Sequence, residues 1–504
     1  MLIVFGEDAG AGKWSILASV KPLRYWVILC FVASQTLTGQ STEPPNILFI
    51  AADDLNDYVG CLDSLPGVRT PNIDRLAARG VTFTNAHCQA PLCGPSRASL
   101  MSGRLASTTG IYAMIDDENI RRSSPANDSI VLLPEYFQAN GYQTAGVGKL
   151  FHQGDRAGAF QEYGGGFSWF GPRPKRRVHY DPEWFGKPPG TSTDWGGYPP
   201  SDTAMTDRRV ADWAINRLER GFTAPFFLGV GFLRPHVPWY VPPHWLDSFA
   251  LADIDLPPYR SDDWDDVPAF ARELYDVPMM PTTEWARETG VWPEMVRAYL
   301  ASIAFMDHQV GRVLDALDAS PYANNTVIIL FSDHGYHLGE KGRFAKHSLW
   351  RQATRVPLLI AGPGVEGKQT VAAPVGLIDL YPTLADLTGL SIPTGLEGHT
   401  LCPLFDDPAA AWPHVSVTTY GYGNHSLHGQ RYHYIRYHDG SEELYDLAAD
   451  PAEWTNLAGD GGFWQILEAF RGKLPTVNTP NVPLSTYNVN AYFRQQLPYL
   501  GRPD

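Results

Sequence analysis

The sequence is poor in cysteine and has no long apolar run. Five cysteines among 504 residues are too few for a disulfide-stapled scaffold, and a chain of this length can bury a large core without such links. The apolar run Tyr25 to Ala33 is too short for a normal transmembrane helix. Internal repeats and low-complexity tracts are also missing, which excludes solenoid and fibrous architectures. The sequence therefore predicts a globular protein with no stable membrane span.

An excess of positive charge is missing as well. The chain has 39 Lys and Arg against 54 Asp and Glu, a formal net charge of −15. Nucleic acid is therefore excluded as a general partner, because such binders present a basic surface. Any anionic substrate would need a local cluster of basic side chains. One basic run, Lys175-Arg176-Arg177, is interpreted as solvated surface, with contact to an acidic glycan as the alternative.

The N-terminal residues have the pattern of a targeting segment. Lys21 and Arg24 precede the apolar run, and small or polar residues follow to about Thr42. This order is typical of a secretory signal, so we expect residues 1–40 to be a signal peptide and leader, and the protein to be periplasmic or secreted. The segment 6–13 resembles a phosphate-binding loop only faintly, because Trp14 stands where Ser or Thr is needed.

Two apolar runs end in side chains that suit a metal ion. Continuous apolar runs are typical of central strands covered on both faces, and open α/β sheets bind ligands at the carboxyl ends of their strands. Adjacent carboxylates repel each other unless a cation lies between them, and their oxygens suit Ca²⁺ or Mg²⁺. The alternative is a polar loop after each strand. The runs 46–52 and 325–331 are followed by Asp53 and Asp54 and, after Ser332, by Asp333 and His334.

Cys93 is expected on a loop just before a helix. Pro95 fixes a backbone angle, and Ser96 and Arg97 open the helix. The free amide groups of a helix N-terminus favour anions, so the cysteine would lie beside an anion site. The alternative is a buried structural cysteine ahead of a core helix.

Further candidate residues occur singly. Lys149 and His152 are three positions apart and can share a helical face, although isolated residues of these types are commonly on the surface. His236 is flanked closely by prolines, which suits a rigidly held general acid or any packed loop. The segment 339–350 contains Lys341, Lys346 and His347 as competing basic candidates.

Cys93-Gly94-Pro95-Ser96-Arg97, followed by Gly103-Arg104, resembles the activation motif of the type I sulfatases, and the other motifs occur in that family's order over residues 45–457. The resemblance implies an α/β, alkaline-phosphatase-like fold with a large mixed sheet flanked by helices. It places a catalytic domain at 45–405 and a smaller C-terminal antiparallel-sheet subdomain at 412–504.

The resemblance also implies a set of roles. A formylglycine-generating enzyme would convert Cys93 to formylglycine, whose hydrated gem-diol is the nucleophile. Arg97 would orient that diol, and Asp333 would accept its proton. Lys149 and Lys346 would bind the sulfate oxygens, His236 would protonate the leaving sugar oxygen, and His152 would help to expel sulfate. One Ca²⁺ would be held by Asp53, Asp54, Cys93, Asp333 and His334. Apart from Cys30 in the leader, this leaves Cys61, Cys88 and Cys402, an odd number from which no disulfide framework is read.

Asp333-His334 and Gly148-Lys149-x-x-His152 are similar to the iduronate 2-sulfatase branch. The predicted substrate is the 2-O-sulfate of iduronate, or of a related uronate, in glycosaminoglycan-type oligosaccharides. A sulfatase for another sulfated sugar or small ester, a phosphoryl hydrolase of the same fold, and a non-catalytic glycan-binding relative remain alternatives. The insertions 153–200 and 250–292 would determine specificity, and the acids Asp262, Asp263, Asp265 and Asp266 are interpreted as solvated surface.

Overall fold

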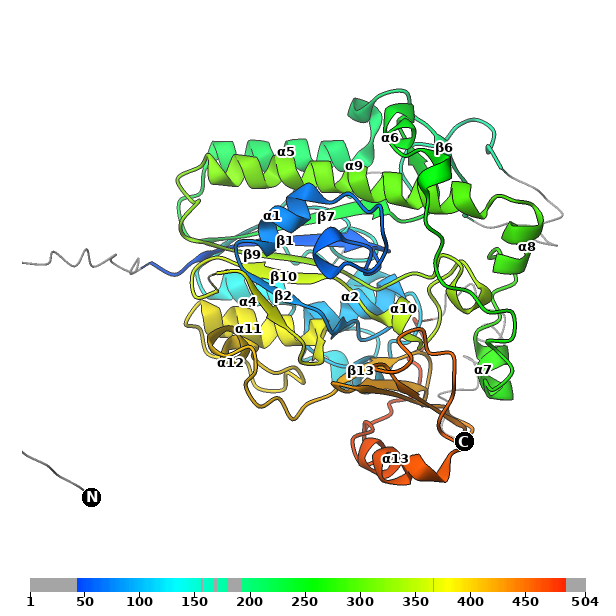
Figure 1. The fold of residues 1–504 in the computed structure, drawn as a ribbon. Helices are drawn as coiled ribbons and strands as arrows, with labels where there is room; N and C mark the ends of the chain where they lie inside the picture. Colours follow the sequence, from blue (N-terminus) through cyan, green and yellow to red (C-terminus); the bar gives the residue numbers. More distant parts are fainter. Residues whose placement is uncertain (1–42, 156, 167–169, 180–191, 366, 486–504) are drawn as a thin grey trace, which may run out of the picture. The chain divides into compact units, whose positions relative to one another are not determined.

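Strand β1 (Asn46–Asp53) lies inside an eight-stranded mixed sheet, and all eight of its residues are buried (Figure 1). Its parallel neighbours are β7 (Phe226–Pro235) and β9 (Thr326–Ser332). The computed structural model describes residues 43–485 except 156, 167–169, 180–191 and 366. The expected signal peptide and the loop-like segment 6–13 lie outside the described residues.

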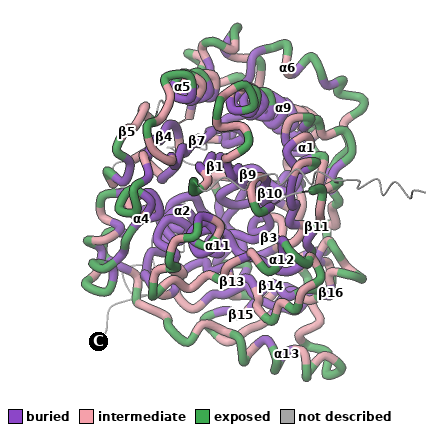
Figure 2. The backbone as a smooth tube through the Cα atoms, turned by 90° about the vertical axis from the view of Figure 1, so that its left-hand side faces the viewer, coloured by how far each residue is buried: buried purple, intermediate pink, exposed green. Residues whose placement is uncertain are grey.

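The side chains of β1 contribute to two hydrophobic cores because they alternate between the two faces of the sheet. Leu48 and Ile50 belong to a core shared with helices α5 (Thr206–Arg220) and α9 (Trp292–Asp318). Ile47 and Phe49 belong to a second core. That core includes residues of α2 (Cys93–Ser102), α4 (Leu133–Ala139) and α11 (Leu380–Leu387). Figure 1 shows the two helical layers on opposite sides of the sheet, and Figure 2 shows the buried strands between them.

The sheet is mixed because β10 runs antiparallel to both of its neighbours. The strand order is β11-β2-β10-β9-β1-β7-β4-β5. The remaining strands of this sheet are β2 (Val81–Phe83), β4 (Gln143–Gly148), β5 (Glu162–Tyr163), β10 (Leu358–Ala361) and β11 (Gln369–Val371). Two further pairs are β3 (Ala86–His87) with β12 (Val375–Gly376) and β6 (Trp195–Gly197) with β8 (Trp239–Val241). Shorter helices are α1 (Pro71–Ala77), α3 (Ala106–Thr109), α6 (Pro243–Asp247), α7 (Ala269–Leu274), α8 (Thr283–Glu288), α10 (Arg351–Thr354) and α12 (Cys402–Asp406).

A small antiparallel sheet follows near the C-terminus, with α13 (Trp464–Arg471) beside it (Figure 1). This confirms the expected architecture of a large mixed sheet flanked by helices and a smaller antiparallel sheet. The boundaries 45–405 and 412–504 remain predictions. The strands of the small sheet are β13 (Ser416–Thr419), β14 (His425–His428), β15 (Tyr432–Arg436) and β16 (Glu442–Asp446).

Three stacked imidazoles join the small sheet to the main body. The ring centroids of His87 and His428 are 3.5 Å apart, and those of His428 and His433 are 3.8 Å apart. Burial, followed by the charges of neighbouring groups, holds the pKa of both His87 and His428 well below the ordinary value. Because His87 and His428 are neutral, their rings can stack closely without charge repulsion, so this contact stabilises the docking of β14 against β3.

The described cysteines Cys61, Cys88, Cys93 and Cys402 are all free. Within the described ranges, no helix is both long and apolar enough to cross a membrane.

Candidate active site

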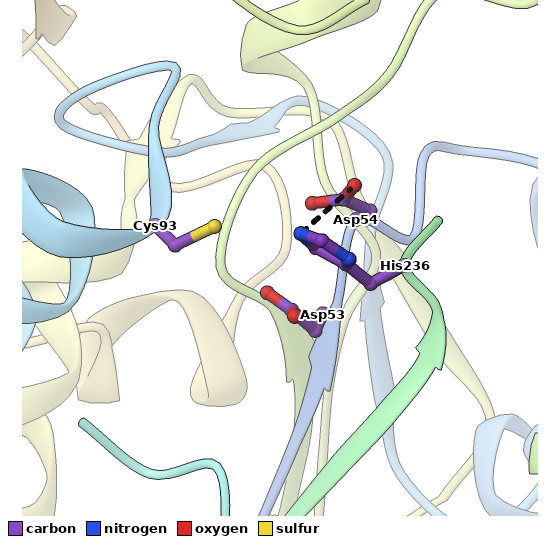
Figure 3. Close-up of side chains that lie close together, drawn as sticks. All are labelled: Asp53, Asp54, Cys93 and His236. Carbon is purple, nitrogen blue, oxygen red and sulfur yellow. Dashed lines mark ion pairs between the residues drawn. The ribbon is translucent and has the colours of Figure 1, made fainter. Parts of the chain in front are cut away.

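The predicted site residues converge at the carboxyl end of the central strands. Figure 3 shows the Cys93 side chain pointing toward Asp53, Asp54 and His236. Ligand atoms of Asp53, Asp54, Cys93 and His236 lie within 4.8 Å of one another, and a second overlapping group joins Asp53 and Cys93 to Asp333 and His334. The polar residues at the ends of strands β1, β7 and β9 therefore lie close together.

Asp54 is held in an unusual backbone conformation. Its φ of 63° lies in the left-handed region, which Asp tolerates better than most residues. The Tyr299 hydroxyl donates to the Asp54 carbonyl oxygen over 2.7 Å and accepts from the Asn56 amide over 2.9 Å. Tyr299, on α9, therefore fixes the turn after β1. No sequence motif singled out this tyrosine.

Cys93 is the first residue of α2, so the helix begins three residues before Ser96, where it was expected to open. Its Sγ lies 3.1 Å from both His334 Nε2 and Lys346 Nζ. Burial alone would raise the pKa of the Cys93 thiol, but the charges of Lys149, Lys346 and His334 hold it well below the ordinary value. The surroundings of this side chain therefore favour a negatively charged group.

Arg97 is fully buried and links three parts of the site. Its Nε donates to Asp333 Oδ2 over 2.8 Å, and its Nη2 lies 3.4 Å from Asp53 Oδ1. Its Nη1 donates to the backbone carbonyls of Lys149 and Leu150. Arg97 therefore orients carboxylates and the Lys149 turn.

Lys149 and His152 do not share a helical face, because the chain forms a turn there. Gly148 has a φ of 79°, and a Cβ on Gly231 would lie 2.3 Å from the Lys149 backbone, so both glycines permit the close approach that this turn requires. Lys149 Nζ lies 2.5 Å from Asp53 Oδ2. The Asp117 carboxylate accepts from the His152 amide over 3.1 Å and holds the second half of the turn. Both predicted side chains still line the cavity.

His236 faces the cluster from the end of β7. Its Nε2 lies 3.8 Å from Asp54 Oδ2, while its Nδ1 lies 2.6 Å from the Val237 carbonyl oxygen. This second contact places the proton on Nδ1 in the neutral ring and leaves Nε2 toward the cavity. The buried Arg234 donates to the His236 carbonyl over 3.0 Å.

The three basic candidates of segment 339–350 separate in space. Lys346 Nζ lies 2.6 Å from Asp54 Oδ1 and enters the cavity, and His347 lines the same cavity. Lys341 lies outside it and pairs with Asp263 over 2.8 Å, their side chains being 3% and 2% exposed. The interpretation of Asp263 as solvated surface was therefore wrong. Its partner is 78 positions away and no local pattern revealed it.

Replacing Lys341 with Met is expected to lower the free energy of unfolding by about 3–5 kcal/mol, because Asp263 is left as a buried, unpaired carboxylate. Urea unfolding of both proteins measures the difference. Specific activity per folded molecule should stay unchanged. The double variant Lys341→Met with Asp263→Leu should regain much of the loss, and a single variant as stable as the wild type would contradict the pairing.

The donor set fits a hard divalent cation. Asp54 Oδ2 is buried and accepts no hydrogen bond, as a metal-binding oxygen would in the absence of its ion. Burial and the Cys93 sulfur oppose ionisation of Asp53, yet Lys149, His236 and Arg97 keep its pKa below the ordinary value. Carboxylates from Asp53, Asp54 and Asp333 supply the oxygen ligands that such a cation prefers.

A cavity of about 630 Å³ opens onto this cluster. Its walls include Met114, Ile115, Phe170, Met280 and Leu484 beside the polar groups. Of the described lining residues, Lys149 and Lys346 are the only lysines, and none is an arginine. The geometry therefore combines a buried cation-binding end with a largely apolar chamber.

Comparison with known proteins identifies the family. The sulfatase family model matches residues 45–390, and that of the N-sulphoglucosamine sulphohydrolase C-terminal region matches 339–479. A sulfatase of Formosa agariphila is 45% identical over 487 residues, covering 94% of this chain and 96% of its own. Human iduronate 2-sulfatase is 33% identical over 410 residues, 72% of each chain. A solved 2-O GAG sulfatase is 25% identical with a TM-score of 0.65, covering 85% of this chain and 91% of its own, and supports the alkaline-phosphatase-like fold. The chain therefore belongs to the sulfatase family and is a hydrolase of sulfate esters.

Proposed function

We propose that this sulfatase removes the 2-O-sulfate of iduronate, or of a related uronate, from glycosaminoglycan-type oligosaccharides. The observation that carries the sulfatase chemistry is the convergence of Lys149, Lys346 and three carboxylates on Cys93. The similarity to human iduronate 2-sulfatase, at 33% identity, supports the choice of substrate.

Two groups complete the proposed site. Formylglycine made from Cys93 supplies, in its hydrated form, one hydroxyl that attacks sulfur and a second that expels sulfate. Ca²⁺, held by Asp53, Asp54, Asp333, His334 and the modified residue 93, supplies positive charge next to the sulfate. Conversion of the thiol would also replace a soft sulfur ligand by oxygen, which suits Ca²⁺ better.

The remaining side chains act on charge and protons. Lys149 and Lys346 bind sulfate oxygens, a preorganised electrostatic contribution of the kind that is usually the largest in catalysis. Arg97 keeps Asp333 oriented, and the Asp333 carboxylate accepts the proton of the attacking hydroxyl. Before a cation binds, burial raises the pKa of Asp333 to about 6 against the opposing charge of Arg97, so this carboxylate is more basic than an ordinary aspartate. His236 protonates the leaving oxygen, and His152 accepts the proton of the second hydroxyl.

The test is desulfation of a defined panel of heparin- and chondroitin-type disaccharides, followed by mass spectrometry on protein whose conversion at Cys93 has been verified. Loss of the uronate 2-sulfate alone is the expected result. Loss of a different sulfate would change the assigned substrate but would leave the proposed sulfatase mechanism unchanged. Loss of none, with turnover of a small aryl sulfate, would contradict the proposed substrate class.

We also propose that residues 1–40 direct export and that a formylglycine-generating enzyme matures the chain. N-terminal sequencing of protein recovered from the periplasm or the medium tests the first proposal. Expression with and without that enzyme, followed by peptide mass analysis at Cys93, tests the second.

A further inference from the structure

A second cavity lies beside the catalytic one. It has a volume of about 590 Å³ and is lined by residues of the segments 264–285 and 342–345. Met280 lines both cavities, so this side chain forms a common wall. Lys346 enters the first cavity and Arg343, three residues earlier, lines the second. One short segment therefore presents a cation to each cavity.

Arg343 is the unusual feature of this second cavity. The residue is 7% exposed, yet its Nε and Nη1 are buried without a hydrogen-bond partner, and it forms no ion pair with any residue that the structure describes. Its Cζ lies 5.7 Å from the centroid of the Tyr275 ring. Asp276 also lines the cavity without forming an ion pair to Arg343. A buried guanidinium without an acceptor is costly, and proteins rarely keep one without a use.

The other walls suit a sugar. Trp264 and Trp285 line the cavity, and Tyr275 forms its buried side. Aromatic faces provide a large contact area for the apolar face of a ring. Arg272 lies at the same cavity and donates to backbone carbonyls of Trp264 and Asp265, which leaves its positive charge unneutralised by any carboxylate among the described residues. The cavity thus combines aromatic surface with two arginines and one carboxylate, that of Asp276, which leaves an excess of positive charge.

The catalytic cavity itself contains few positively charged side chains. Its described lining offers only the two lysines assigned to the sulfate, and no further arginine or lysine for another acidic group of the substrate. A glycosaminoglycan-type chain carries such groups on every repeat. Arg343, which has no ion-pair partner in the adjoining cavity, supplies the additional positive charge that the catalytic cavity lacks.

We propose that the second cavity is a subsite for an acidic group of the oligosaccharide, a carboxylate or a second sulfate, and that Arg343 binds it through charge-assisted hydrogen bonds while Trp264 and Trp285 contact the sugar. This inference rests on the proposed function, because it assumes an oligosaccharide that extends past the scissile sulfate. Arg343 is then a specificity-determining residue that does not touch the reacting atoms.

The test compares Arg343→Met with the wild type on two substrates. For a heparin-type tetrasaccharide with a terminal 2-O-sulfated uronate, kcat/KM should fall about 10- to 100-fold, the usual effect of one lost charge-assisted hydrogen bond. For a small aryl sulfate, which does not reach the second cavity, kcat/KM should stay unchanged. Carboxyl-reduced and N-acetylated tetrasaccharides then show whether the carboxylate or the sulfate is recognised.

Stability separates a binding role from a structural one. Because the Arg343 guanidinium has no ion-pair partner among the described residues, Arg343→Met should melt at the same temperature as the wild type or higher. Arg209→Met removes the same charge from an exposed position on α5 outside both cavities and should change neither activity nor melting. Arg343→Lys should restore part of the tetrasaccharide activity. A lowered melting temperature, or equal losses on both substrates, would overturn the subsite.

A binding measurement keeps the subsite distinct from the substrate proposal. Calorimetry with the Cys93→Ser protein uses an acidic heparin-type tetrasaccharide and a neutral oligosaccharide of equal length. Arg343-dependent binding of the acidic probe alone, without turnover of uronate sulfates by the wild type, would keep the subsite and reject the substrate. If uronate sulfates are turned over equally well with and without Arg343, the substrate proposal is kept and the subsite is rejected.

Discussion

Cys93→Ser is expected to leave the protein folded and to reduce turnover of sulfate esters by roughly 10³-fold or more. Serine offers a single hydroxyl. It can accept sulfate from a substrate, but it lacks the second hydroxyl that would expel the sulfate again. Lys149, Lys346 and Arg97 stay in place, so substrate binding should survive. The measurements are steady-state turnover, thermal unfolding and the intact mass of the protein after incubation with substrate.

The intact mass is the most informative of these measurements, because a trapped sulfate adduct on residue 93 would report the first half of the reaction. Cys402→Ser is the matched control, since that cysteine is free, half-buried and absent from the catalytic cavity. It should behave like the wild type. Normal turnover in the Cys93 variant would reject the formylglycine mechanism.

His236→Gln is expected to lower kcat by about 10²- to 10⁴-fold on a sugar sulfate, the usual contribution of a general acid. The loss should shrink strongly on an aryl sulfate with an acidic phenol, because such a leaving group departs without protonation. Glutamine keeps a polar side chain of similar size near Asp54. Plotting the rates of both proteins against leaving-group pKa measures the difference.

His236 is also a member of the candidate metal cluster, so it could act either as a general acid or as a metal ligand. Calcium content measured on the purified variant should match the wild type if the residue acts on protons. A variant that loses its metal, or that loses activity equally on all leaving groups, would show that His236 is a ligand. His244→Gln, at an exposed histidine on α6 whose side chain is 60% exposed, serves as the control.

The central strands could be predicted because their information is local. The uninterrupted apolar run before Asp53 indicates a strand buried on both faces, and the acids directly after it indicate a ligand edge. The same reasoning found Asp333 at the end of β9. These predictions needed only the order of residues along one strand, and the sheet register then brought the two strand ends together.

What could not be predicted depends on contacts between distant segments. Asp263 looks solvated beside its acidic neighbours, and only the fold brings Lys341 to it. The turn at Lys149 is set by the approach of Gly231 from β7, so helical spacing to His152 was misleading. Arg343 lies in the segment 339–350, but nothing in that segment distinguished it, because its lack of an ion-pair partner depends on the packed structure.

The position of Cys93 has a consequence for how active protein is obtained. At 1% exposed, on the first turn of a packed helix, its thiol is out of reach of another protein's active site once the chain has folded. If a formylglycine-generating enzyme converts Cys93, as proposed above, it has to act before the chain folds. Chains that fold first would then keep the thiol, and treating the native protein with that enzyme should not raise its specific activity.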